Sequence, residues 1–152
     1  MFPAIALRAR VLVSAGQEEE AAALVTELLD DWTETGGMLA SFWTADVAFV
    51  LSALGRGDEL AEAAAAAKMP TRWLEAAKAF TGGEFERAAD LYGEIGTLPD
   101  EAFARLRAAE ALVALGRRSE ADFQLRRALA FYHRVAATAY VREGEALLAA
   151  SG

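Results

Sequence analysis

The chain has 152 residues, enough for one ordinary domain, and its 15 basic and 23 acidic residues give a formal net charge of −8. Because a nucleic-acid-binding surface needs a concentrated basic face, this acidic balance argues against a nucleic-acid partner. The chain contains no cysteine, which excludes disulfides, thiolate metal sites and cysteine nucleophiles. It shows no secretion signal and no apolar run of the roughly 18 residues of a membrane span, which predicts a cytoplasmic protein without a membrane partner.

Glycine and proline residues divide the sequence into predicted helices, and the alternation typical of strands never persists. We therefore expect an all-α fold. In chain order, the predicted helices cover residues 3–15, 18–35, 38–54, 58–68, 71–80, 84–95, 100–115, 119–135 and 139–150. Gly36-Gly37, Pro70 and residues 97–100 separate successive helix pairs, and the last helix follows the fourth pair.

A glycine turn recurs inside each of the four predicted helix pairs. It follows an apolar helix end and precedes a helix start with acidic residues and alanine, at Gly16, Gly55, Gly83 and Gly116. The spacings are 39, 28 and 33 residues, which scatter around the 34-residue period of tetratricopeptide repeats. Glycine takes the left-handed conformation that ends a helix, and acidic residues favour the N-terminus of the next helix. The pattern predicts four helical hairpins that stack to bury a continuous core.

The hairpins resemble the tetratricopeptide-repeat family at its small, large and turn positions. The last hairpin matches that pattern best and the first hairpin next, at Ala109, Leu112, Gly116, Ala121 and Ala128 and at Ala9, Leu12, Gly16 and Ala21. The resemblance covers nearly the whole chain, but its motifs are degenerate. It implies a single domain over residues 1–152, a right-handed α-α superhelix of about four hairpins with the last helix as a C-terminal cap.

A narrower resemblance lies between Gly116 and Leu148, through the segments Gly116–Ala121, Leu125–Tyr132 and Tyr140–Leu148. These segments resemble the C-terminal tail of large bacterial regulators, in which a nucleotide-cyclase or LuxR-type DNA-binding head and a signalling ATPase precede a helical-repeat tail. The resemblance implies that the chain is a fragment of such a regulator. Neither the head nor the ATPase is present, so none of their activities carries over.

The first predicted helix is apolar almost all round, with Ile5, Leu7 and Val11 on its circumference. A terminal repeat normally presents a polar outer face, because solubility requires it. We therefore expect a preceding helix or a second copy of the chain to cover this helix. Ile5, Leu7 and Val11 are the predicted self-association residues of a homodimer.

The family resemblance also implies a concave groove, lined by the first helix of each hairpin. The predicted groove positions are Arg10, Val13, Phe42, Ala45, Phe49, Phe103, Leu106, Glu110 and Val113. The family's clamp for a C-terminal carboxylate uses lysine and asparagine, and this chain has no asparagine. A mostly apolar groove suggests a partner helix or extended segment, or self-association, while burial by neighbouring helices remains an equal alternative.

The charge is unevenly distributed along the chain. Residues 1–76 contain 5 basic and 12 acidic residues, whereas residues 103–152 contain 8 basic residues, all arginine, and 5 acidic ones. A positive C-terminal end could meet an acidic partner. Solvated helix faces explain the same pattern, and this explanation is the more common one.

Two sequence features resemble parts of catalytic or metal-binding sites, but each lacks the further residues that such a site needs. The segment Asp30-Asp31-Trp32-Thr33-Glu34 has the DDxxE form of helical terpene synthases, but magnesium would need further oxygen ligands and no second acidic motif of that kind is evident. We interpret it as a solvated helix end. His133 is the only histidine, and one histidine cannot form a zinc site or a catalytic triad. We predict no catalytic residue, metal or cofactor, and therefore no enzyme.

The leading functional hypothesis is a non-catalytic scaffold or regulatory domain that binds another protein or a peptide. The alternative is a small-ligand-sensing helical domain with a pocket inside the superhelix near Trp43, Phe49 and Trp73.

Overall fold

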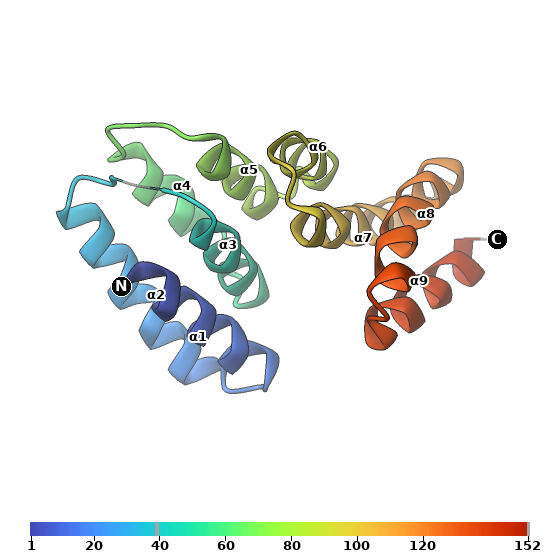
Figure 1. Cartoon of the computed structure of the whole chain (residues 1–152), viewed down its shortest axis with the longest axis horizontal. Helices are drawn as coiled ribbons and strands as arrows, with labels where there is room; N and C mark the ends of the chain where they lie inside the picture. The colour runs from blue at the N-terminus through green and yellow to red at the C-terminus, as the bar shows by residue number, and fades with distance from the viewer. Residues whose placement is uncertain (39, 152) are drawn as a thin grey trace. The chain divides into compact units, whose positions relative to one another are not determined.

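The computed structural model describes residues 1–38 and 40–151, and in these ranges every regular element is an α-helix (Figure 1). The helices are α1 (Phe2–Ser14), α2 (Glu18–Glu34), α3 (Trp43–Ala53), α4 (Asp58–Ala65), α5 (Arg72–Thr81), α6 (Phe85–Ile95), α7 (Leu98–Ala114), α8 (Arg118–Arg134) and α9 (Thr138–Ser151). The prediction of an all-α chain is confirmed. None of the helices described has both the length and the apolar character needed to cross a membrane.

The four glycines predicted at the hairpin turns share one conformation. The φ angles of Gly16, Gly55, Gly83 and Gly116 are 78°, 68°, 78° and 72°. These values lie in the left-handed region, where a side chain would be strained, so glycine is the residue that ends these helices at low cost.

The largest difference from the predicted helices lies before α3. We predicted a helix from Met38, but α3 begins at Trp43, and Leu39 lies outside the described residues. Two carbonyls of this segment accept hydrogen bonds from side chains. The indole Nε1 of Trp32 donates to the oxygen of Met38 at 2.9 Å, and the hydroxyl of Thr71 donates to the oxygen of Ala40 at 2.8 Å. These two carbonyls therefore take part in tertiary hydrogen bonds and not in helical ones.

The chain divides into two compact units, residues 1–83 and residues 84–152. In unit 1, α1 packs against α2 and α3, and α3 packs against α5. The largest side chains of this core are Trp32 and Trp43, whose rings meet edge to face at 5.6 Å between centroids. Buried aromatic pairs of this kind add about 0.5–1.5 kcal/mol beyond the area that they bury.

In unit 2, α7 packs against α6, α8 and α9. Alanine makes up half of the buried cluster between these helices, which contains Ala102, Leu106, Ala109, Leu125, Ala128 and Tyr132. Because alanine side chains are small, they let α7 and α8 pack closely in this cluster.

Helix α9 approaches α8 closely at Gly144, where an added Cβ would lie 2.7 Å from Cδ2 of Leu129. We expect Gly144→Ala to lower the free energy of unfolding by about 1 kcal/mol, because overpacking costs about 1–3 kcal/mol and the helix propensity of alanine returns about 1 kcal/mol. In a Leu129→Ala background the same change should stabilise the protein, because the contacting atoms are gone. Urea denaturation followed by circular dichroism measures both; a loss of equal size in the two backgrounds would contradict the packing argument.

Candidate functional site

Two of the predicted groove residues of unit 1, Arg10 and Phe49, contact each other across α1 and α3. The guanidinium of Arg10 donates to Oδ1 of Asp46 at 2.7 Å and lies 4.4 Å from the ring centroid of Phe49. Arg10 therefore joins α1 to α3. Val13 is half-buried, Phe42 is exposed and Ala45 is buried.

Two of the four predicted groove residues of unit 2, Phe103 and Leu106, lie where α9 packs. Leu106 is 0% exposed and belongs to the core, so its side chain cannot line a groove. The ring of Phe103 meets that of Tyr140 at 6.0 Å. Glu110 is exposed and accepts a hydrogen bond from Arg107 at 2.7 Å, and Arg107 also pairs with Glu143 of α9. Val113 is half-buried. The family's groove register thus places several residues of α7 at a helix contact.

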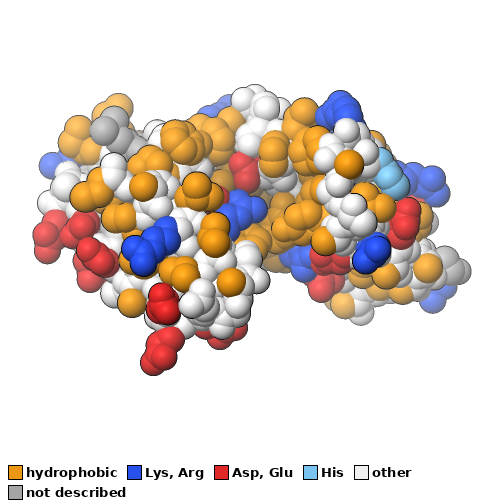
Figure 2. Space-filling view, turned by 60° about the horizontal axis from the view of Figure 1, so that its bottom comes forward, with side chains coloured by type: hydrophobic (Ala, Val, Ile, Leu, Met, Phe, Trp, Pro, Cys, Tyr) orange, Lys and Arg blue, Asp and Glu red, His pale blue; other side chains and the backbone are white. Residues whose placement is uncertain are grey.

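Two of the three predicted self-association residues, Leu7 and Val11, share one exposed side of α1, and Ile5 lies on another side of the helix. Apolar side chains reach the surface between charged ones in Figure 2. Leu7 is 56% exposed and Val11 is 60% exposed, four residues apart and hence neighbours on the helix, while Ile5 is half-buried. The homodimer itself stays a prediction.

Of the residues near which a small-ligand pocket was predicted, Trp43 is part of the buried core. Trp43 is 2% exposed, and its ring meets those of Phe2 and Trp32 at 5.3 and 5.6 Å. Phe49 and Trp73 are half-buried.

The DDxxE segment has a buried residue at its centre, Trp32. In the described part of the chain, no group of three or more His, Asp or Glu side chains is arranged to hold a metal ion.

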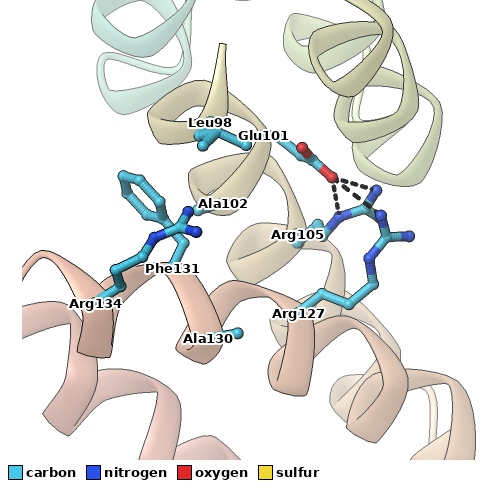
Figure 3. Close-up of a pocket in the computed structure, with 8 residues that line it drawn as sticks. All are labelled: Leu98, Glu101, Ala102, Arg105, Arg127, Ala130, Phe131 and Arg134. Carbon is cyan, nitrogen blue, oxygen red and sulfur yellow. Dashed lines mark hydrogen bonds and ion pairs between the residues drawn. The ribbon is translucent and has the colours of Figure 1, made fainter. Parts of the chain in front are cut away.

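A cavity of about 290 Å³ opens in unit 2 between the first half of α7 and the second half of α8 (Figure 3). We call it the α7–α8 pocket. It is lined by Leu98, Glu101, Ala102, Arg105, Arg127, Ala130, Phe131 and Arg134. None of these residues was among the predicted groove positions.

Helix periodicity explains why these residues line one space. On α7 the lining positions are 98, 101, 102 and 105, and on α8 they are 127, 130, 131 and 134. Each set follows the i, i+3, i+4, i+7 spacing that places residues on one helix face. Ala102 and Ala130 occupy the middle of the two rows, and their small side chains leave the space between the helices open.

A carboxylate shared by two arginines forms one end of the pocket (Figure 3). Oε1 of Glu101 accepts hydrogen bonds from Nε and Nη2 of Arg105, at 2.9 and 2.8 Å, and from Nη2 of Arg127 at 3.2 Å. Arg105 is only 2% exposed, and its Nη1 donates to Oε1 of Gln124 at 2.8 Å. Asp90 lies 3.4 Å from Nη2 of Arg105. These contacts fix the orientation of Arg105 and Glu101.

The other end of the pocket is apolar, and it is flanked by a third arginine. Leu98 is 46% exposed, and the guanidinium carbon of Arg134 lies 5.8 Å from the ring centroid of Phe131. In Figure 3 the Arg134 and Phe131 side chains lie next to each other, on the opposite side of the pocket from Arg105. No ion pair links Arg134 to a carboxylate among the described side chains. The lining thus contains three arginines and one glutamate.

These groups suit binding better than proton transfer. A guanidinium keeps its charge at any physiological pH, so an arginine cannot act as an acid or a base there. It binds carboxylates and phosphates through two parallel hydrogen bonds. The arrangement therefore favours an anionic group next to an apolar one.

The chain was also compared with known proteins. It matches no protein-family model, no curated protein and no solved structure.

Proposed function

We propose that this chain is a non-catalytic scaffold domain that binds another protein, and that the α7–α8 pocket is part of its binding surface. The observation that carries the proposal is the pocket itself, where two helix rows combine the buried Arg105 and two more exposed arginines with apolar side chains. Interfaces are enriched in arginine and aromatic residues, because these side chains provide most of the binding energy.

In this proposal the helices form about four tetratricopeptide-like hairpins in a right-handed superhelix that α9 closes. The left-handed glycines at all four predicted turns support this arrangement, since each turn ends one helix and begins the next. The resemblance of residues 116–148 to regulator tails suggests that the domain serves a larger bacterial transcriptional or signalling protein.

A peptide-display selection tests this function. The whole wild-type chain serves as bait, and Ala130→Glu serves as the blocked variant, because its carboxylate would enter the pocket beside Arg127 and Arg134. Ala146→Glu is the matched control, since it adds the same group to an exposed alanine of α9 that lies outside the pocket.

We expect the wild-type chain and Ala146→Glu to enrich the same peptides, and Ala130→Glu to bind them at least about tenfold more weakly, which corresponds to about 1.4 kcal/mol. Peptides that bind all three proteins equally would place the binding surface elsewhere. Failure to enrich any peptide would contradict the proposed function.

A further inference from the structure

We infer that the α7–α8 pocket recognises an acidic side chain next to an aromatic or other large apolar side chain, on a segment of another protein that lies along α8. This inference rests on the proposed function and specifies the chemistry of the partner.

The exposed face of α8 extends beyond the pocket. Phe123, Arg127, Ala130, Phe131 and Arg134 lie at spacings of 4, 3, 1 and 3 residues, which places them within an arc of about 100° on the helix. Phe123 is 57% exposed, and the guanidinium of Arg127 lies 5.7 Å from its ring centroid. We call these five residues the α8 stripe. At 1.5 Å per residue the stripe is about 16 Å long, which suits a polypeptide segment better than a small molecule.

The charge of the pocket calls for an anion. Glu101 already accepts from both Arg105 and Arg127, so it compensates part of the positive charge, while Arg134 is paired with no described carboxylate. A guanidinium that lies against an aromatic ring keeps its in-plane N–H groups free to donate sideways. Arg134 on Phe131 and Arg127 on Phe123 both have this ring contact. A carboxylate between Arg127 and Arg134 would accept hydrogen bonds from either.

The apolar part of the pocket calls for a large side chain next to that carboxylate. Leu98 and Phe131 form its sides, and Ala102 and Ala130 leave the space between them. A volume of about 290 Å³ lies at the lower limit of ligand pockets, which are about 300–1,000 Å³, so it suits a side chain better than a cofactor. An aromatic ring there gains both apolar burial and contact with the Arg134 guanidinium.

Fluorescence anisotropy with the whole chain tests the inference. The probe is a labelled peptide with two aspartates and one tryptophan in a glycine-serine background. Two matched peptides replace the aspartates with lysine or the tryptophan with alanine. Arg134→Gln is the test variant, and Arg118→Gln is the control, because Arg118 lies on the same helix but outside the stripe.

We expect the acidic peptide to bind the wild-type chain and Arg118→Gln with the same affinity. The affinity of the wild-type chain for each matched peptide, and that of Arg134→Gln for the acidic peptide, should be at least about tenfold lower. Raising the salt concentration should weaken binding of the acidic peptide, since the contact is partly exposed.

The other outcomes separate the inference from the proposed function. Equal binding of the lysine peptide and the acidic peptide would overturn the inference and leave the proposed function intact. The same conclusion would follow if the display selection enriched peptides without acidic residues and Ala130→Glu blocked their binding. Equal competition by free phenylpropionate, at the same concentration as the peptide, would assign the pocket to a small acid. Wild-type dimers in light scattering that become monomers with Arg134→Gln would make a second copy the occupant. If neither the designed nor any selected peptide binds, both proposals fail.

Discussion

Replacing Arg105 with methionine is expected to lower the free energy of unfolding by about 3 kcal/mol. Arg105 is the only buried cation among the described residues, and it donates to both Glu101 and Gln124. Removing one partner of a buried ion pair costs about 3–5 kcal/mol, because the other charge stays buried without compensation. We expect the lower end of that range, since Glu101 keeps its contact with Arg127 and its side chain is 14% exposed.

Arg126→Met is the matched control for this prediction. The Arg126 side chain is 70% exposed and pairs with Asp122 at 2.8 Å, a solvent-screened surface contact that contributes little to stability. Urea denaturation followed by far-UV circular dichroism compares the two variants. Adding Glu101→Gln to Arg105→Met should recover part of the loss, because it removes the uncompensated charge. Equal stability of Arg105→Met and Arg126→Met would show that the buried network contributes no net stability.

The second large effect is expected at Gly37, in unit 1. Gly37 has a φ of +65°, and an added Cβ would lie 2.6 Å from the Cα of Ala67. Gly37→Ala therefore combines a left-handed conformation, which costs about 1–2 kcal/mol for an L-residue, with a clash against backbone that cannot rotate away. Overpacking adds about 1–3 kcal/mol, so we expect a total loss of about 3 kcal/mol.

Gly16→Ala separates these two contributions. Gly16 has a φ of +78°, but no atom lies within 4 Å of the position of an added Cβ. It should therefore lose only the conformational part, about 1 kcal/mol. Tryptophan fluorescence during urea denaturation measures both variants well, because Trp32, Trp43 and Trp73 all lie in unit 1. Equal losses at Gly37 and Gly16 would show that the chain adjusts around Ala67.

The helices could largely be predicted from the sequence, because local signals mark where they end. Glycine turns and acidic helix starts lie in the sequence itself, and the structure has helices on both sides of Gly16 and Gly116. The segment before Trp43 could not be predicted in this way. Its residues are compatible with a helix, and only the hydrogen bonds from Trp32 and Thr71, one of which spans 31 positions, hold it outside one.

The candidate site was harder to predict. The two rows of the pocket have the same i, i+3, i+4, i+7 spacing as an ordinary core-facing helix side, so the pattern alone does not distinguish them from core. Periodicity also does not reveal that two alanines face each other and leave a cavity, or that Arg105 is buried. The excess of arginine in residues 103–152 did indicate a basic C-terminal end. It did not indicate that two of these arginines, Arg105 and Arg127, donate to the same carboxylate of Glu101.

All the cations of the pocket and of the α8 stripe are arginines, and residues 84–152 contain no lysine. Lysine acetylation, which removes a positive charge, therefore has no target in this half of the chain, whereas Lys68 and Lys78 of residues 1–83 are open to it. Arginine methylation keeps the charge but blocks bidentate hydrogen bonding. A cell that needed to weaken this surface without unfolding it would have to methylate its arginines or change the charge of the partner.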